Sequence, residues 1–491
     1  MAGFGLLSAA ALPPVHLVPV LLICLPALLR GIGRTGGWRG AAAAGFWFGF
    51  GHHLAGLYWL TEAILVEAAR FWWLVPLAVP MLAAVMAVFI ALPCAVARLV
   101  PAGWPRLWVL AGGWVAADLA RQFVASGFPW NPLGSVWAAP GWAGDAMLQP
   151  AAWVGVHGMT LATLVLAGLP LFGRRALASG AIVLAAWMGA GAWRLGAAGV
   201  SVPAVAIVLV QGNIAQDGKW ERTRALRIFS DYLALTRQGV AEAKRLLPGA
   251  VPLVIWPETA SPFLLDADPA ARSAIANAAG GMVLAGSLRL DAARRPFNSL
   301  VAIDGNGATA AVYDKWHLVP FGEYQPGWFP LPIALVTGEG FGRGEGPRTI
   351  ALPGLPAFGP LICYEAIFSG EGVAAERPDW LVNVTNDAWF GNSTGPRQHL
   401  AAARMRAVEA GLPLMRAANT GISAGFDAYG RELGRIGMNV PGALVLALPA
   451  ALPAPFYADF GLMVPASLAS GALALGLLLG WRARRASRPL L

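Results

Sequence analysis

Residues 359–365 read Gly-Pro-Leu-Ile-Cys-Tyr-Glu, an apolar run that ends in a cysteine and a carboxylate. A short apolar run bounded by glycine and proline is typical of a buried β-strand. We therefore predict a strand over Ala357–Cys363, followed by a helix. A thiol at a helix N-terminus, near a lysine, is expected to favour its thiolate form. Cys363 is accordingly either an inert buried residue or a nucleophile.

Outward from this stretch, short β-rich runs alternate with amphipathic helical runs. The predicted strands are 204–210, 251–256, 281–288, 298–304, 357–363, 380–385 and 414–418, and the predicted helices are 221–247, 269–279 and 398–410. Such alternation, with apolar strands, is typical of an α/β or layered α+β core. Roughly 250 residues suit one large domain.

The rest of the chain has a different composition. The 491 residues are 57% hydrophobic and 12% charged, whereas soluble proteins carry about 25% charged residues. Residues 201–455 contain 21 basic and 21 acidic residues, so the net charge of +9 lies entirely in the hydrophobic remainder. A basic chain can indicate nucleic-acid binding. Here the position of the charges argues against a nucleic-acid partner and indicates membrane topology.

Apolar runs near 20 residues predict membrane-spanning helices. We predict about eight spans, the first two short: 1–12, 15–29, 40–61, 72–99, 105–123, 151–172, 176–195 and 459–481. The predicted domains are a transmembrane bundle over 1–199, an α/β domain over 200–455 and a C-terminal span with a basic tail over 456–491. A cleaved signal peptide is an alternative for the first segment, but no basic residues precede its apolar run.

The arginines of the short loops predict the orientation of the bundle, because cytoplasmic loops are enriched in basic residues. With a cytoplasmic N-terminus, eleven arginines fall on the cytoplasmic side and three on the opposite side. The eleven are Arg30, Arg34, Arg39, Arg98, Arg106, Arg174, Arg175, Arg482, Arg484, Arg485 and Arg488, and the three are Arg70, Arg121 and Arg194. This orientation predicts a multi-pass membrane protein with residues 200–455 outside the cytoplasm, which is the periplasmic side of the inner membrane if the cell is a bacterium with an outer membrane.

Three polar segments of residues 200–455 carry residue types suited to chemistry. They are centred on Glu258 after a predicted strand, on Lys315 in a polar segment, and on Cys363. Taken singly, each has an ordinary explanation: a turn carboxylate, a solvated lysine and a buried thiol. Cys363 is the single cysteine between residues 200 and 455, so no disulfide can form within this region.

Taken together and in order, the three segments resemble a known family. Trp256-Pro257-Glu258, then Asp314–Glu323 (Asp-Lys-Trp-His-Leu-Val-Pro-Phe-Gly-Glu), then Ile362-Cys363-Tyr364-Glu365 are similar to the nitrilase superfamily and, within it, to the apolipoprotein N-acyltransferase family. Further similar segments are Gln211–Ile214, Lys219-Trp220, Asn298-Ser299, Asn386–Gly391, Arg416–Gly421 and Gly127–Trp130. Seven helices before the domain and one after it also match the family arrangement.

The resemblance implies a multi-pass helical membrane bundle joined to an αββα sandwich, with Glu258 as general base, Lys315 as electrostatic stabiliser and Cys363 as nucleophile. It implies supporting roles for Glu323 and Glu365, and we predict a supporting role for Tyr364 as well. The candidate substrate-binding residues are Trp220, Asn298, Trp389 and Phe390, of which the aromatic ones are alternatively ordinary core residues. The implied donor is a membrane phospholipid, and the implied acceptor is the α-amino group of a diacylglyceryl-cysteine at a lipoprotein N-terminus. A thioester on Cys363 would link the two steps. Neither a metal nor an organic cofactor is implied.

Other interpretations stay open at this point. A membrane-anchored amidase or nitrilase fits the three residues equally well, although eight spans exceed what an anchor needs. A transporter would be expected to carry several buried charges along its spans, whereas only Asp118 and Arg121 approach this. That pair is either functional or a simple i,i+3 ion pair. The glycine-rich segment Leu335–Gly346 is either a mobile lid or a passive surface loop.

Overall fold

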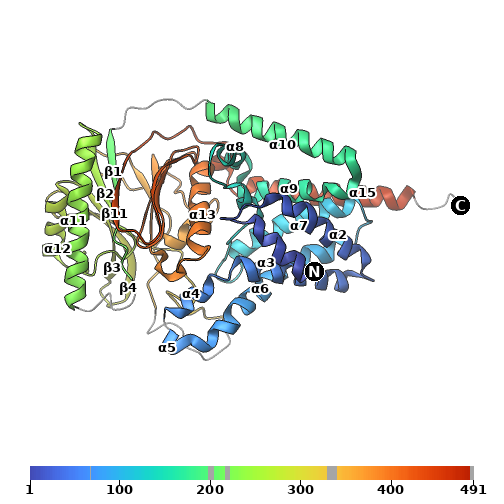
Figure 1. The fold of residues 1–491 in the computed structure, drawn as a ribbon, viewed down its shortest axis with the longest axis horizontal. Coiled ribbons are helices and arrows are strands. Elements are labelled where there is room, and N and C mark those ends of the chain that lie inside the picture. The colour runs from blue at the N-terminus through green and yellow to red at the C-terminus, as the bar shows by residue number, and fades with distance from the viewer. Residues whose placement is uncertain (67, 197–203, 216–221, 329–339, 487–491) are drawn as a thin grey trace. The chain divides into compact units, whose positions relative to one another are not determined.

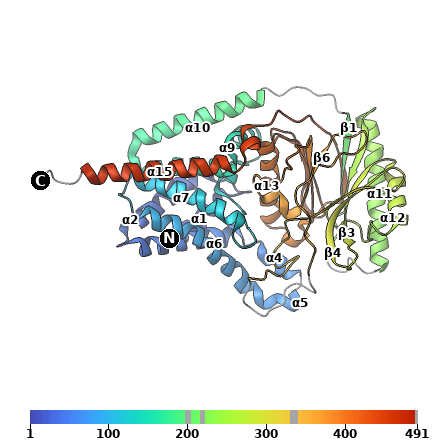
Figure 2. The same ribbon diagram turned by 180° about the vertical axis from the view of Figure 1, so that it is seen from behind.

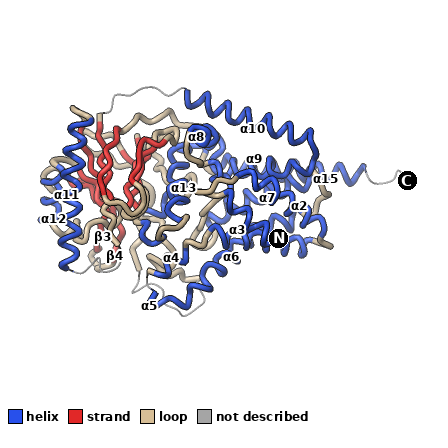
Figure 3. The backbone as a smooth tube through the Cα atoms, viewed as in Figure 1, coloured by secondary structure: helices blue, strands red, loops and turns tan. Residues whose placement is uncertain are grey.

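The computed structural model describes residues 1–66, 68–196, 204–215, 222–328 and 340–486. Contacts divide the chain into two compact units. The helical unit comprises Met1–Ala198, Ser393–Ala401 and Pro455–Leu491, and the α/β unit comprises Gly199–Asn392 and Ala402–Ala454. Figure 1 shows the helices and strands of both units, and Figure 3 separates them by colour.

The helical unit contains a helix in each predicted span. Its helices are α1 (Ala2–Ser8), α2 (Leu21–Arg34), α3 (Trp38–Gly56), α4 (Leu60–Leu65), α5 (Ala68–Phe71), α6 (Val75–Ala97), α7 (Trp104–Phe123), α8 (Trp142–Leu148), α9 (Ala151–Gly168), α10 (Gly173–Gly196), α14 (Phe456–Phe460) and α15 (Met463–Ala486). Small residues let these helices approach closely, as in membrane bundles. A Cβ atom on Gly112 of α7 would lie 2.7 Å from the carbonyl oxygen of Ala469 on α15. The two helices run side by side in Figures 1 and 2.

Three helices among the described residues are long and apolar enough to cross a membrane: Trp72–Ala97, Ala151–Gly196 and Met463–Ala486. The middle one covers two of the predicted spans. The other predicted spans are helical but shorter or more polar. In α7 this polarity comes from Arg106, Asp118 and Arg121, of which Asp118 and Arg121 form a buried ion pair of 3.2 Å. The total of about eight spans stays a prediction.

The α/β unit is built on two sheets. The first has the strand order β11-β1-β2-β3-β4-β5 and the second the order β10-β9-β8-β7-β6. The strands are β1 (Val205–Gln211), β2 (Val251–Ile255), β3 (Val283–Leu290), β4 (Pro296–Ile303), β5 (Thr309–Asp314), β6 (Phe358–Ile362), β7 (Trp380–Thr385), β8 (Leu414–Ala418), β9 (Ser423–Phe426), β10 (Glu432–Ile436) and β11 (Gly442–Ala447). Strands β1, β2 and β3 are parallel, as are β6, β7 and β8.

Alternation along β1 explains the layering of this unit. Val205, Ile207 and Leu209 face a core shared with the second sheet. Ala206, Val208 and Val210 face the opposite core, which is shared with α11 (Arg222–Leu246) and α12 (Pro269–Ala279). Helix α13 (Gly395–Ala410) covers the second sheet (Figures 1 and 2). The predicted αββα sandwich is therefore the fold of this unit.

Four strands were not predicted from the sequence: β5, β9, β10 and β11. Strand β5 is alanine-rich and half exposed, and β10 is a polar edge strand. Strand β9 contains serine and glycine, and it is buried between β8 and β10 in the second sheet. Strand β11 is an edge strand of the first sheet. It pairs antiparallel with β1, which is more than 200 residues away in sequence. Pairing of this kind depends on tertiary contacts that a local pattern does not contain.

Candidate active site

The three predicted catalytic residues follow three different strands. Glu258 follows β2, Lys315 follows β5 and Cys363 follows β6. Since β2 and β6 belong to different sheets that share one core, their carboxyl ends bring the two side chains together between the sheets. All three residues are buried, with 6%, 1% and 8% of their surface exposed respectively. Such burial keeps bulk water away from the reacting groups.

The carboxylate of Glu258 is held by both of its oxygens. Its Oε1 accepts from Nδ2 of Asn298 at 2.6 Å and from Nζ of Lys315 at 3.4 Å. Its Oε2 accepts from the backbone N–H of Asn386 at 2.8 Å. A glycine is needed behind this turn, because a Cβ atom on Gly286 of β3 would overlap the carbonyl oxygen of Pro257. The orientation of Glu258 is thus fixed by neighbours from four separate segments.

Lys315 contacts a second carboxylate at closer range. Its Nζ donates to Oε1 of Glu323 at 2.8 Å, and that same oxygen accepts from Nδ2 of Asn298 at 2.9 Å. Burial lowers the pKa of Lys315, but the charges of Glu323 and Glu258 raise it by more, so its net pKa lies above the ordinary value. Lys315 is therefore an ammonium throughout the physiological range. It can stabilise negative charge but cannot act as a base.

Replacing Lys315 by methionine is expected to destabilise the protein by about 3–5 kcal/mol, because it leaves Glu258 and Glu323 buried without their cation. The measurement is the thermal unfolding midpoint of the purified protein. Lys244→Met is the matched control, since Lys244 is exposed on α11. An unchanged midpoint for Lys315→Met would show that the two carboxylates do not depend on this ammonium.

Cys363 has an unusual backbone conformation. Its φ angle is +50°, a left-handed value that costs a non-glycine residue energy and is frequent at functional sites. It begins a 3₁₀ helix of five residues, Cys363–Ile367. Burial and the charge of Glu258 raise the pKa of Cys363 above its ordinary value, against the opposing effect of Lys315. The prediction that a helix N-terminus favours the thiolate is therefore wrong: the helix is too short, and burial dominates.

A buried polar chain behind Cys363 was not predicted from the sequence. The side chain of Thr385 hydrogen-bonds the side chain of Cys363. Its single hydroxyl proton is donated to Oδ1 of Asp387 at 3.0 Å while Cys363 is a thiol, and this proton can turn to Sγ when the thiolate forms. Asp387 forms an ion pair of 2.7 Å with Arg416, and both side chains are fully buried. A Cβ atom on Gly421 would overlap the Asp387 carboxylate. The signal in the sequence was the polar pair Asn386-Asp387 directly after a fully buried strand.

We expect Thr385 to be a positioning residue for the thiolate. Thr385→Val keeps the shape but removes the hydroxyl that lowers the pKa of Cys363, so this pKa should rise. The rate of thiol alkylation by iodoacetamide should fall about tenfold near neutral pH, and its pH profile should move to higher pH. Thr385→Ser should restore the profile, and Thr309→Val on the exposed strand β5 should leave it unchanged. An unshifted profile in Thr385→Val would contradict this role.

Glu365 links the lysine segment to the cysteine segment. Its Oε1 accepts from the backbone N–H groups of Trp316 at 2.7 Å and His317 at 3.3 Å. Its Oε2 accepts from the N–H of Ile362 at 2.7 Å and from the hydroxyl of Tyr313 at 3.1 Å. Burial raises the pKa of Glu365 to about 7, opposed by these backbone donors. These contacts suit a supporting role, in which Glu365 holds the backbone after Lys315 next to the backbone before Cys363.

The remaining predicted site residues lie in different environments. Tyr364 is buried and packs edge-on against Phe368, with ring centroids 5.2 Å apart. Asn298 is buried between Glu258 and Glu323, whereas Trp389 is 39% exposed and Phe390 is partly buried. Trp220 lies outside the described residues. The structure thus brings Asn298 to the carboxylates of Glu258 and Glu323, and the predicted substrate contacts of Trp389 and Phe390 stay predictions.

The described part of the predicted lid is attached to the site. The backbone N–H of Phe341 donates to the carbonyl of Glu323, and that of Gly344 to the carbonyl of Lys315, both at 2.8 Å. Residues 335–339 of the predicted lid lie outside the described residues. Residues 340–344 therefore form a wall beside Lys315, and lid motion stays a prediction.

Both parts of the chain are similar in sequence to known protein families. Residues 4–169 match the apolipoprotein N-acyltransferase N-terminal domain, and residues 209–451 match the carbon-nitrogen hydrolase family. A protein from Bradyrhizobium diazoefficiens named apolipoprotein N-acyltransferase is 40% identical, over 99% of this chain and 94% of its own length. A protein of the same name from Rhodopseudomonas palustris is 39% identical, over 96% and 93%.

Solved structures similar to this chain cover about half of it. An amidase from Nesterenkonia sp. is 21% identical, with a TM-score of 0.40, over 54% of this chain and 96% of the amidase. A carbon-nitrogen hydrolase from Helicobacter pylori is 16% identical, with a TM-score of 0.39, over 49% of this chain and 87% of its own.

Proposed function

The chain belongs to the apolipoprotein N-acyltransferase family, and from this we propose that it transfers a fatty acyl chain from a membrane phospholipid to an apolipoprotein. The acceptor is the free α-amino group of the N-terminal diacylglyceryl-cysteine, and the transfer is the last step of bacterial lipoprotein maturation. The chain is an enzyme of this family with a nitrilase-like domain. The observation that carries the proposed mechanism is the buried group of Glu258, Lys315 and Cys363.

In the first step, Sγ of Cys363 attacks the ester carbonyl of the phospholipid while Glu258 takes the thiol proton. The oxyanion of the tetrahedral intermediate is stabilised by the Lys315 ammonium and by the backbone N–H of Tyr364, donors of a kind that contribute about 3–4 kcal/mol each. The intermediate collapses and the carbon–oxygen ester bond breaks. Glu258 returns its proton to the leaving alkoxide, which departs as a lysophospholipid and leaves a thioester on Cys363.

In the second step, the lipoprotein amine attacks the thioester carbonyl, and Glu258 takes a proton from the amine. Collapse of this intermediate forms the amide and expels the Cys363 thiolate, which regains its proton from Glu258. The three hydrogen bonds to Glu258 support this repeated role, because they fix the carboxylate without blocking proton exchange. Burial of the site supports transfer to an amine over hydrolysis, since water is kept away from the thioester.

The chain is a membrane protein, and both proposed substrates are amphiphiles held in a membrane leaflet. The distribution of arginines supports an inner-membrane location with the catalytic domain, residues 200–455, on the periplasmic side. In this arrangement residues 1–199 and 456–491 form the membrane part. The same leaflet then supplies the phospholipid donor and the diacylglyceryl acceptor.

The proposed function is tested by incubating the purified protein with phospholipid vesicles that carry an isotopically labelled acyl chain, together with a synthetic diacylglyceryl-cysteinyl peptide. We expect the peptide to gain one labelled acyl group as an amide. A peptide with an acetylated N-terminus is the control and should gain none. Release of labelled free fatty acid without acylated peptide would instead support the alternative, a membrane-anchored carbon-nitrogen hydrolase type of enzyme that uses water as acceptor.

A further inference from the structure

One end of the helical unit is rich in arginine, and contacts bring its segments together. Arg98 donates through Nε and Nη2 to the carbonyl of Thr35 at 3.1 and 2.9 Å, which joins the end of α6 to the end of α2. Arg484 near the end of α15 donates to the carbonyl of Leu99. We call this the basic end. Its sequence segments, which hold ten arginines and no aspartate or glutamate, are residues 30–39, 97–106, 168–176 and 481–486.

Arg106 of the basic end is buried, with 6% of its surface exposed. Its Nη2 donates to the carbonyl of Val100 at 3.2 Å, and its Nε has no hydrogen-bond partner among the described residues. Its Nη1 lies over the exposed Gly33 of α2, where a Cβ atom would be 3.0 Å away. The bond to Val100 goes to a neutral group and does not balance the charge of Arg106. Such a buried cation is costly unless a negative charge pairs with it.

The position of Arg106 within α7 adds to this cost. Helix α7 begins at Trp104, so Arg106 lies in its first turn, where the helix carries a partial positive charge. Helix α10 begins close by, because the ring of Trp104 stacks on that of Phe172 with centroids 4.0 Å apart. The first turn of α10 contains Arg174 and Arg175, and neither first turn contains an acidic residue. Two helix N-termini and three arginines therefore favour the binding of an anion at this end.

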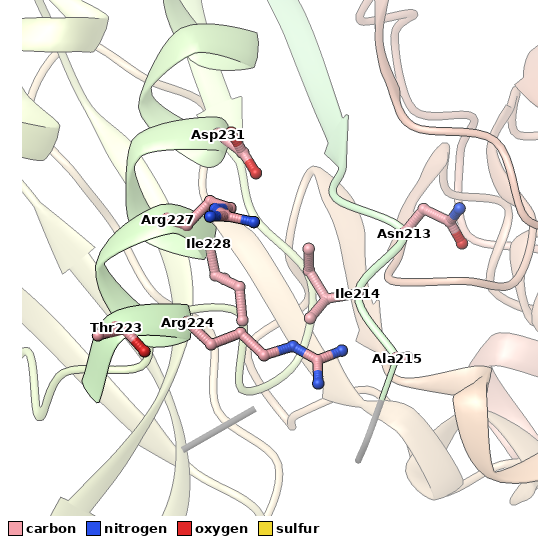
Figure 4. Close-up of a pocket in the computed structure, with 8 residues that line it drawn as sticks. All are labelled: Asn213, Ile214, Ala215, Thr223, Arg224, Arg227, Ile228 and Asp231. Carbon is pink, nitrogen blue, oxygen red and sulfur yellow. The ribbon is translucent and has the colours of Figure 1, made fainter. Parts of the chain in front are cut away.

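The acidic residues of the helical unit lie in other segments. They are Glu62, Glu67, Asp118, Asp145 and Asp459. Asp118 is on α7 itself, but twelve residues of helix separate it from Arg106 by about 18 Å. Arginines of the α/β unit differ in this respect: Arg224 and Arg227 line one pocket together with Asp231 (Figure 4). The charge of Arg106 is thus left to an anion from outside the chain.

The surface around these arginines is apolar, which indicates that the anion carries hydrocarbon chains. Leu99 is 56% exposed, and three tryptophans of the basic end are 40–53% exposed: Trp38, Trp104 and Trp481. Exposed tryptophans of this kind are typical of the interface between a membrane and water. Basic pockets between helices at the cytoplasmic face of a membrane protein are known binding sites for anionic lipid headgroups.

We propose that the basic end binds an anionic phospholipid. Arg106 and Arg98 bind the headgroup phosphate above Gly33 with charge-assisted hydrogen bonds, and the acyl chains lie against Leu99 and Trp104. In the proposed topology this end is cytoplasmic. The lipid is therefore in the leaflet opposite to the one that supplies the proposed substrates, and it is not the acyl donor. This inference uses the proposed topology and does not depend on the proposed reaction.

The test measures lipid binding to the full-length protein in a neutral detergent by native mass spectrometry. Phosphatidylglycerol is compared with phosphatidylcholine of identical acyl chains, in a Cys363→Ala background that prevents acyl transfer from either lipid. We expect phosphatidylglycerol to bind more tightly. Adding Arg106→Gln should weaken its binding about tenfold and leave the binding of phosphatidylcholine unchanged. Gly33→Leu retains every arginine but fills the space over Nη1 of Arg106, so it should also weaken the binding of phosphatidylglycerol.

Arg39→Gln is the matched control, because it removes an exposed arginine from the same end of the bundle. It should weaken the binding of phosphatidylglycerol less than about twofold. Equal losses in Arg39→Gln and Arg106→Gln would overturn the site, since binding would then follow the overall charge. Equal binding of the two lipids would overturn it as well. Displacement of phosphatidylglycerol by an equal concentration of inorganic phosphate would show that the ligand is a free anion and not a lipid. None of these results bears on the proposed reaction, which Cys363→Ala cannot perform.

Discussion

Replacing Cys363 by alanine is expected to abolish acyl transfer, with a loss of about 10⁴-fold or more in kcat. The alanine variant has no atom that can form the thioester, so the reaction loses its covalent route and not only one stabilising contact. Thermal unfolding should change little, because Cys363 is already strained at φ +50° and its side chain is small. The measurement is the rate of labelled acyl transfer from vesicles to the diacylglyceryl peptide.

The chain provides its own controls for this experiment. Cys24 and Cys94 are also buried free cysteines, but they lie on α2 and α6 of the helical unit. Cys24→Ala and Cys94→Ala should retain transfer within a few-fold, since a buried thiol there packs as a small apolar group. Full activity in Cys363→Ala would remove the nucleophile from the mechanism, whatever the state of the other two cysteines.

Replacing Glu258 by glutamine is expected to lower kcat by about 10³-fold, the loss typical of a general base. The change preserves size but removes the group that accepts the thiol proton. It also removes one of the two negative charges that Lys315 contacts. The ammonium keeps the other, since its ion pair with Glu323 at 2.8 Å is not changed. The protein should therefore stay folded while both acylation and discharge become slow.

Two measurements separate a lost base from a lost structural contact. The acylation rate in Glu258→Gln should fall about 10³-fold, whereas its thermal midpoint should fall less than that of Lys315→Met. Glu242→Gln, an exchange on the solvent side of α11, is the control for loss of a carboxylate as such. A normal acylation rate in Glu258→Gln would assign the base to another residue.

The sequence could predict those parts of the site that follow buried strands. Strands β2 and β6 are continuous apolar runs, so the positions of Glu258 and Cys363 after them could be read from the local pattern. Lys315 is different, because β5 is half exposed and carries no such pattern. It was found only through the resemblance of the segment that follows it. The αββα layering likewise agrees with the family that the motifs indicated.

Contacts between distant segments could not be predicted from the sequence. The bonds of Glu258 to Asn298 and Asn386 depend on sheet order and on which strand ends meet. The left-handed backbone of Cys363 is set by the packing of the turn after β6, for which a cysteine gives no local signal. The raised pKa of its thiol follows from burial, and burial between two sheets is a tertiary property.

In the proposed mechanism, Cys363 carries the acyl chain between donor and acceptor. The most direct test is the intact mass of wild type and Cys363→Ala, before and after the diacylglyceryl peptide is added. We expect wild type to carry one added fatty-acyl mass that hydroxylamine removes, and to lose it to the peptide, which gains the same mass. Cys363→Ala should carry none. Wild type without an adduct in the presence of phospholipid, or an adduct that persists in Cys363→Ala, would contradict the thioester mechanism.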